Sequence, residues 1–201
     1  MKTIKGIVAA TSLLLATQAS AIPTFSDLVT SANSVGGNIT ESLFNPTALS
    51  LDEVWTKQDG AEVKFKAEIS DFDNKMGYAN TDGTGGITVL DEGTQPGAWI
   101  SIAAAPDPFV FFLDTNNGSG DQWFSKNSLN DDGEDHMLAF QRKADPNKFI
   151  LFWDDQNGGG DRDFNDFVAR VNFVQPVPEP GTLALLGLGL AGLGARFRRK
   201  S

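Results

Sequence analysis

The sequence contains no cysteine and only one histidine, and both shortages narrow the range of functions. An exported chain without cysteine has no disulfide bonds, so a hydrophobic core or a bound metal must stabilise its fold. Catalysis by a Cys-His pair and zinc sites of the usual His and Cys type are excluded. No nucleophile-elbow sequence accompanies His136, and we expect this histidine to make a local structural hydrogen bond. The chain is therefore predicted not to be an enzyme.

Basic residues are scarce between the two ends of the chain. The whole sequence has 16 Lys and Arg against 26 Asp and Glu, a net charge of −10. Residues 1–21 hold two of the basic residues and residues 182–201 hold four, with no acidic residue in either segment. Residues 22–181 therefore have 10 basic and 26 acidic residues, a net charge of −16. This balance argues against nucleic acid and anionic lipid as partners and favours divalent cations.

Apolar runs of about 20 residues, the length of a comfortable membrane span, are absent as well. The first residues, MKTIKGIVAATSLLLATQASA, have lysines, then an apolar stretch, then small residues that include Ala19 and Ala21. This order is typical of a secretory signal peptide over residues 1–21, and we expect cleavage after Ala21. The protein is therefore predicted to be exported.

The end of the chain, VPEPGTLALLGLGLAGLGARFRRK, has three features in order. They are the triplet Pro178, Glu179 and Pro180, an apolar run at 182–195, and a basic end with Arg196, Arg198 and Arg199. This order resembles the PEP-CTERM sorting signal of Gram-negative bacteria. The resemblance implies a short transmembrane helix in residues 182–201 that is inserted transiently, and cleavage near the triplet by an exosortase. It further implies export through the inner membrane and release to the cell surface or matrix. A permanent anchor is the alternative, and the short run disfavours it.

Short apolar runs fill the middle of the chain. Residues 62–69, EVKFKAEI, alternate apolar and charged residues with the period of a half-buried strand. Six more runs are rich in Val, Ile, Phe and Trp and lie between turn residues, at 86–90, 98–103, 108–113, 136–141, 148–153 and 167–174. We predict an all-β fold, an antiparallel and jelly-roll-like β-sandwich of seven or eight strands over residues 62–174. Residues 22–61 are expected to form an irregular lead-in with one short helix or edge strand, and residues 175–181 a linker.

Acidic residues and glycines are concentrated in FWDDQNGGGDRDFNDF, which begins at Phe152. Only Arg162 offsets the repulsion between its carboxylates, and a bound cation would relieve that repulsion. Calcium takes six to eight oxygen ligands, and glycines allow a loop to curl around the ion. We predict a calcium site with ligands from Asp154, Asp155, Asn157, Asp161, Asp163 and Asp166. Asp161 and Asp163 are expected to face one side of an extended run, with Phe164 pointing into the core. An EF-hand is rejected because strands flank the loop, and a solvated hairpin tip is the alternative.

Two further loops have a weaker form of this pattern. Their candidate ligands for a second metal site are Asp114, Asn116, Asp121, Asp131 and Asp135. The alternative is ordinary turns with solvated charges. One composite site would require these loops to lie at the same end of the sandwich as residues 158–160.

The order of these segments resembles the bacterial family called domain of unknown function 4114. Its G-G-D-x-D-[YF]-N-D core matches Gly159 to Asp166, and its D-G-x-D-H segment matches Asp132 to His136. The resemblance covers about residues 85–174. Family members often have FEDL where this chain has FWDD, which leaves the first ligand open between Asp154 and Asp155. The resemblance implies an exported β domain and calcium, and it names no activity.

Three functions fit these observations. The first is a non-enzymatic cell-surface or matrix protein, stabilised by calcium, that acts in surface polysaccharide, biofilm or adhesion. The second is a carbohydrate-binding module, which requires an exposed platform made from Trp55, Trp99, Trp123 or Trp153. The third is a glycan hydrolase, which requires a cleft that pairs two carboxyl groups, one of them protonated.

Overall fold

The computed structural model describes residues 22–49, 53–91, 93–94, 97–115, 120–159 and 161–177. The predicted signal peptide with Ala19 and Ala21 lies outside these residues. So do the Pro178, Glu179 and Pro180 triplet and the predicted C-terminal helix with Arg196, Arg198 and Arg199. Within the described ranges no helix is long and apolar enough to cross a membrane.

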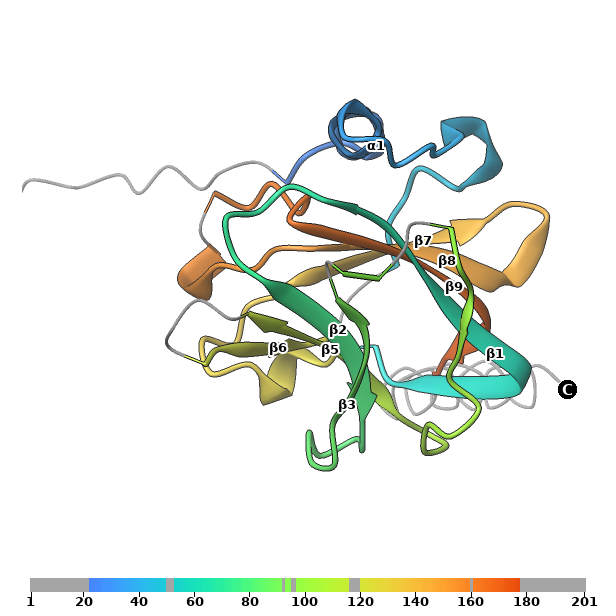
Figure 1. Cartoon of the computed structure of the whole chain (residues 1–201), viewed down its shortest axis with the longest axis vertical. Coiled ribbons are helices and arrows are strands. Elements are labelled where there is room, and N and C mark those ends of the chain that lie inside the picture. Colours follow the sequence, from blue (N-terminus) through green and yellow to red (C-terminus); the bar gives the residue numbers. More distant parts are fainter. Residues whose placement is uncertain are drawn as a thin grey trace, which may run out of the picture.

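Two antiparallel sheets make up the fold (Figure 1). Sheet A has the order β4 (Ile100–Ser101), β1 (Trp55–Glu68), β9 (Phe167–Pro176), β8 (Asp145–Trp153) and β7 (Met137–Arg142). Sheet B has the order β3 (Ile87–Asp91), β2 (Asn74–Ala79), β5 (Val110–Thr115) and β6 (Gln122–Phe124). The predicted all-β class is confirmed, and the two sheets fit a sandwich.

The main core lies between the two sheets. It contains Trp55 and Phe149 from sheet A and Phe111 and Trp123 from sheet B. Apolar burial of this kind contributes about 25 cal/mol for each Å² removed from water. The fold therefore has the large core that a chain without disulfides requires.

The second half of β8, from Phe149 to Trp153, is buried on both faces, which explains its unbroken apolar run. Phe149, Leu151 and Trp153 point into the main core, while Ile150 and Phe152 belong to a second cluster on the outer face of sheet A. Side chains alternate between the two faces of a strand, so a strand covered on both sides has no polar positions.

Helix α1 (Phe25–Ser34) covers the outer face of sheet A (Figure 1). It begins with a capping box, in which the side chains of Thr24 and Asp27 each bond to the other residue's backbone N–H. Its buried residues, which include Leu28, share the second cluster with Ile150 and Phe152. The predicted lead-in at 22–61 thus contains an ordered helix, the 3-10 turn η1 (Glu41–Leu43) and the start of β1 at Trp55.

Three details of the strands differ from the sequence expectation. The described residues form nine strands, two of which, β2 and β6, were not predicted because they have no clear apolar run. The connectivity is not jelly-roll-like, because β7, β8 and β9 follow one another as a meander in one sheet. Strand β9 extends to Pro176, into the predicted linker, and the N–H of Val177 donates to the carbonyl of Val54 at 2.7 Å.

Candidate functional site

The predicted acidic loop is the connection between β8 and β9, residues 154–166, here called the β8–β9 loop. Backbone hydrogen bonds close its base: the N–H of Asp166 donates to the carbonyl of Trp153 at 3.1 Å. The carbonyl of Asp166 in turn accepts from the N–H of Ile69 at 3.1 Å, just after β1. The acidic residues are therefore fixed where the loop leaves the sheet.

Asp155 is the best-anchored carboxylate of the loop and is only 1% exposed. Its Oδ2 accepts from Ser70 Oγ at 2.5 Å and from Asn74 Nδ2 at 2.8 Å. Its carbonyl accepts from Trp123 Nε1 at 3.0 Å, and its N–H donates to Asp166 Oδ2 at 2.9 Å. Asp155 thus joins the β8–β9 loop to the β1–β2 connection and to β6 in the other sheet.

A polar cleft separates the β8–β9 loop from the β1–β2 connection. It is lined by Glu68, Ile69, Ser70, Asp71 and Phe72 on one side, and by Asp155, Gln156, Asp161, Asp163, Asn165 and Asp166 on the other. Asp161 is exposed, Asp163 is half-buried, and Asp166 is buried. Four of the six predicted ligands therefore share one cleft.

Burial and mutual repulsion raise the pKa of several of these carboxyl groups. For Asp166, burial is the largest cause, and it outweighs the hydrogen bond from the N–H of Asp155. Repulsion from Asp155, Asp163 and Asp154 adds to it, and the pKa rises to about 9. Burial also raises the pKa of Asp163, with repulsion from Asp161 and Asp155. The cleft is therefore short of positive charge.

Asp154 lies at the base of the loop and is 1% exposed. Its Oδ1 accepts from the N–H of Gln156 at 3.0 Å, while its Oδ2 is buried without a hydrogen-bond partner in the described structure. Asn165 Oδ1 is in the same condition. Burial raises the pKa of Asp154, and Asp161 and Asp155 repel its charge. A buried oxygen without a donor costs free energy, which a cation at that oxygen would offset.

The loop backbone between the acidic residues is strained. Arg162 has a φ of 55° and Phe164 a φ of 50°, both in the left-handed region that costs a residue with a side chain about 1 kcal/mol or more. Asp161 and Asp163 both line the cleft, while Phe164 is 2% exposed and packs in the cluster beneath α1. Asp161 and Asp163 therefore face one side and Phe164 the other, as predicted. The predicted cause was an extended run, whereas the structure has left-handed residues at Arg162 and Phe164. Strain of this kind is often found at functional sites.

The oxygen atoms of the cleft are of the kind that a hard cation binds, but they are not arranged as a metal site. Carboxylate and amide oxygens are the ligands that calcium prefers. However, within the described ranges no group of three or more His, Cys, Asp or Glu side chains is arranged to hold a metal ion. Asn157 is exposed in the short η3 turn (Asn157–Gly159) and does not line the cleft. The calcium site therefore stays a prediction.

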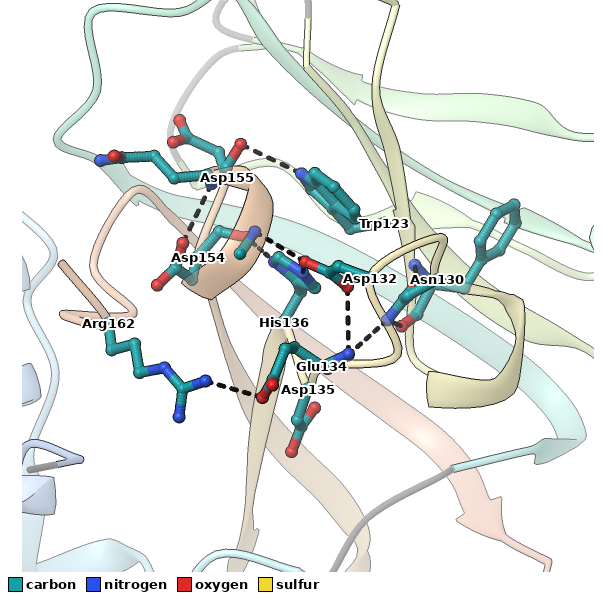
Figure 2. A network of polar contacts seen from close by, with 12 residues as sticks. Trp123, Asn130, Asp132, Glu134, Asp135, His136, Asp154, Asp155 and Arg162 are labelled. Carbon is teal, nitrogen blue, oxygen red and sulfur yellow. Dashed lines mark hydrogen bonds and ion pairs between the residues drawn. The ribbon is translucent and has the colours of Figure 1, made fainter. Parts of the chain in front are cut away.

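A second network holds the other side of the β8–β9 loop (Figure 2). The ring of His136 stacks on Trp123, with centroids 3.9 Å apart and planes 9° apart. Its Nδ1 lies 3.1 Å from the carbonyl of Asp154, and its Nε2 lies 3.0 Å from Asp132 Oδ2. The same Asp132 oxygen accepts from the N–H of Gly158 at 2.8 Å. His136 is therefore a buried structural residue that ties two loops together.

The environment of Asp132 favours its charged form. Burial alone would raise its pKa, but the N–H groups of Glu134 and Gly158 and the ring of His136 lower it. Close by, Arg162 Nη2 donates to Glu134 Oε2 at 2.7 Å. The segment 130–136 therefore lies against the β8–β9 loop, as a composite site would require, but Asp132 and Glu134 make the contacts.

The predicted second metal loop stays a prediction, because the described structure places only four of its five expected ligands. Asp114 lies on β5 and pairs in register with Lys75 and Gln122, and the carbonyl of Asp121 accepts from the N–H of Thr115. Asn116 lies outside the described residues. Asp131 is exposed, and Asp135 points away from His136 (Figure 2) and lines an apolar pocket beside α1. In the sequence, the D-G-x-D-H segment marked this region. Its first residue, Asp132, is the one that contacts the β8–β9 loop, through the N–H of Gly158.

The tryptophans do not form an exposed platform. Trp55, Trp123 and Trp153 are between 0% and 2% exposed and lie in the main core. Trp99 is half-buried, with Lys64 Nζ 5.1 Å and the Arg170 guanidinium 5.7 Å from its ring centroid. A row of aromatic rings for stacking sugars is thus absent from the described structure.

Comparison with known families gives two matches. Residues 95–174 match the family model described as domain of unknown function (DUF4114), and residues 176–200 match the PEP-CTERM protein-sorting motif. Both resemblances noted in the sequence are confirmed. The sorting motif indicates an exported protein that is processed by an exosortase and reaches the cell surface. No curated protein and no solved structure matches the chain.

Proposed function

We propose that the mature protein is a non-enzymatic β domain of a Gram-negative cell surface or extracellular matrix, and that calcium binds in its acidic cleft. Asp154, whose buried Oδ2 has no donor in the described structure, does not line the cleft itself. The observation that carries the proposal is that Asp155, Asp161, Asp163 and Asp166 line one cleft whose described lining includes no Lys or Arg. A cation there would supply the missing positive charge.

The neighbouring residues have distinct parts in this proposal. Ser70 and Asn74 hold one oxygen of Asp155, so that its other oxygen stays available to an ion. Asp163 and Asp166 line the same cleft, and Asp161 is exposed at its mouth. Calcium would draw Asp161 toward the buried oxygens and relieve the repulsion among them. The ion therefore acts as a structural clamp between the β8–β9 loop and the β1–β2 connection.

The sorting motif supports a location of the mature domain outside the inner membrane. An exosortase would cut near Pro178, Glu179 and Pro180 after transient insertion of the tail, and release the acidic domain outside the inner membrane. Partners there are expected to be surface polysaccharides, in a structural or adhesive role within the envelope or biofilm. This part of the proposal is supported by the motif and by the net charge of −16 over residues 22–181, which disfavours nucleic acid as a partner.

The test is thermal unfolding of the mature secreted protein with calcium and with chelator. Calcium at about 100 times its dissociation constant stabilises a folded protein by about 2.7 kcal/mol. Asp163→Asn should lose this response, while Asp59→Asn, at an exposed position of β1, should keep it. An unchanged melting temperature in millimolar calcium would refute the calcium proposal. A response that persists in Asp163→Asn would place the ion elsewhere.

A glycan hydrolase is the second candidate, and one observation favours it. Asp166, with a pKa of about 9, shares a cleft with Asp155, as a protonated acid beside a second carboxylate requires. The absence of an aromatic platform speaks against sugar binding there. Release of reducing ends from acidic or neutral polysaccharides, lost in Asp166→Asn, would establish this function. A calcium response without any hydrolysis would support the structural proposal.

A further inference from the structure

Four of the ten basic residues in segment 22–181 gather on the outer face of sheet A. On β1, Val63 and Phe65 point into the main core, so Lys64 faces outward. Arg170 of β9 is paired directly opposite Lys64 in the register. Lys66 lies at an irregularity of the same strand pair, and Arg142 ends β7. We call these four residues, Lys64, Lys66, Arg142 and Arg170, the basic stripe.

The basic stripe is only partly neutralised: Arg142 pairs in register with Asp145 and its charge lowers the pKa of that carboxyl group, which forms its ion pair with Lys148. None of its members forms an ion pair with a described residue, although the segment has 26 acidic residues. The nearby carboxylates have other donors: Glu62 accepts from Asn172 Nδ2 at 2.8 Å, and Glu68 from the N–H of Asn74 at 3.3 Å. The Nε atoms of Arg142 and Arg170 are buried without an acceptor in the described structure. The stripe thus has unused hydrogen-bond donors as well as unpaired charge.

The positive charges are close enough to disturb one another. Burial lowers the pKa of Lys66, and the charges of Arg170 and Lys64 lower it further. Burial likewise lowers the pKa of Arg170, with repulsion from Arg142. Half-buried groups that repel one another destabilise a fold unless an anion lies between them.

Aromatic rings hold the stripe in place without neutralising it. Trp99 lies within 5.1 Å of Lys64 Nζ and 5.7 Å of the Arg170 guanidinium, and Phe44 lies 5.9 Å from the same guanidinium. Cation–π contacts fix the position of a cation but leave its net charge unchanged. The stripe crosses β1, β9, β8 and β7, which at about 4.8 Å between strands is about 15 Å long. Its shape suits an extended chain that bears negative charges at intervals.

We propose that the basic stripe binds a carboxylated polysaccharide, with Lys64 and Arg170 at its centre. The proposal rests on the proposed function for the location outside the cell and for a polysaccharide partner. It does not depend on calcium, because the stripe lies on the outer face of sheet A and includes none of the residues that line the acidic cleft.

Charge density favours such a polymer over other anions. Charges separated by more than about 8 Å are largely screened at physiological ionic strength. A flexible chain with widely spaced carboxylates that lies on the stripe therefore interacts mainly with the basic residues of the stripe and little with the acidic residues farther away. Duplex DNA carries one negative charge for about every 1.7 Å of its axis and requires a wide basic surface. An anionic membrane is a still broader surface, and a net charge of −16 over residues 22–181 would repel both.

The experiment uses the mature secreted protein in buffer with chelator, which prevents calcium from bridging carboxylates. Affinity electrophoresis compares polygalacturonate with the same polymer after full methyl esterification, which removes the charge and keeps the backbone. The protein should be retarded by the charged polymer only, and less so as salt increases. Lys64→Gln combined with Arg170→Gln should weaken the binding about tenfold or more.

A matched control changes the same charge at other sites. Lys75→Gln with Lys126→Gln removes two lysines on the sheet B side, one ion-paired with Asp73 and one bonded to the carbonyl of Thr81, and should leave binding nearly unchanged. Lys66→Gln with Arg142→Gln tests the stripe independently if the first pair does not fold. Equal retardation by the esterified polymer, equal loss in the control, or tighter binding of duplex DNA would each overturn the proposal. Polymer binding that persists unchanged in both stripe variants would overturn it as well. Failure here would leave the calcium response intact, so the two proposals are tested separately.

Discussion

Asp166 shows how a single residue connects the fold to the chemistry of the cleft. It is 6% exposed, accepts from the N–H of Asp155 and faces three other carboxyl groups. Its pKa of about 9 means that at neutral pH it takes up a proton on folding in the absence of a cation. The Oδ2 of Asp154 accepts no hydrogen bond from a backbone N–H or from any other donor in the described structure. The buried acids of the loop therefore reduce stability unless a proton or a cation is bound.

This arrangement predicts a pH dependence of stability in chelator. The pKa of an unfolded Asp is about 3.9, and that of Asp166 in the fold is about 9. Between these values the folded state binds one more proton, so stability falls as pH rises from about 4 toward 9. Asp166→Asn should flatten the pH profile of the denaturant midpoint, whereas Asp59→Asn should not. A steep decline that persists in Asp166→Asn would assign the pH dependence to another group.

At the scale of elements, the segment 130–136 acts as a brace for the β8–β9 loop. Three of its contacts cross between the loops, from His136 to Asp154, from Asp132 to Gly158, and from Glu134 to Arg162. The stacked ring of Trp123 keeps His136 in position. The N–H of Asp154 also donates to the carbonyl of His136 at 3.0 Å, which extends the β7–β8 pairing to the base of the loop, so side chains make the contacts beyond that point.

His136→Phe should loosen this brace while keeping the ring that stacks on Trp123. The substitution removes both ring nitrogens and leaves the carbonyl of Asp154 and the carboxylate of Asp132 without that partner, at a cost of about 1 to 3 kcal/mol. Trypsin should cut faster after Arg162, and denaturant unfolding should report the loss of stability. Asp131→Asn, at an exposed position of the same segment, is the control. Unchanged cleavage in His136→Phe would show that the loop is held by other contacts.

The sequence predicts elements well where one physical signal dominates. The apolar runs at 108–113 and 148–153 became parts of β5 and β8, because burial on both faces leaves no polar interruption between Val110 and Leu113 or between Phe149 and Trp153. The run at 167–174 became β9 although Arg170 and Asn172 interrupt it. Strand β2 is hidden by Gly77, which is required because an added Cβ would lie 2.2 Å from the carbonyl of Ile87. Strand β6 has only three residues, and α1 has its apolar face on a sheet that the local sequence does not reveal.

The acidic site was predictable in location but not in its contacts. Composition alone marked the β8–β9 loop, and Asp155, Asp161, Asp163 and Asp166 do line one cleft. The partners of Asp155 are Ser70 and Asn74, which are 85 and 81 residues distant along the chain. Such contacts follow from the pairing of the sheets, which spacing in one sequence does not encode. The role of Asp132 was missed for the same reason.

For the whole molecule, the acidic residues lie in the segment 22–181, whereas the two terminal segments carry only basic charges. All six basic residues of segments 1–21 and 182–201 would be lost in processing, so the net charge changes from −10 to −16. The remaining surface combines an acidic cleft at one end of the sandwich with the basic stripe on the face of sheet A. A molecule with both features can hold a cation and a polyanion at separate places.

Processing can be checked by the intact mass of the protein in culture medium. The expected mass corresponds to a chain that begins near Ile22 and ends before Thr182, because both terminal segments are removed. Replacing Pro178, Glu179 and Pro180 together by alanine should keep the tail and retain the protein in the membrane fraction. Recovery of Arg196 in the secreted form would contradict cleavage by an exosortase.

The end of β9 sets how the domain is presented to the enzyme that cuts its tail. The last sheet hydrogen bond, from Val177 to Val54, lies directly before the Pro178 of the sorting triplet. Four residues lie between Val177 and Thr182, and the five steps of an extended chain at about 3.5 Å per residue span at most about 17 Å. In the proposed membrane-inserted state, this strand end would hold the folded domain close to the bilayer. The processing enzyme must work in the narrow gap between a completed fold and the membrane surface.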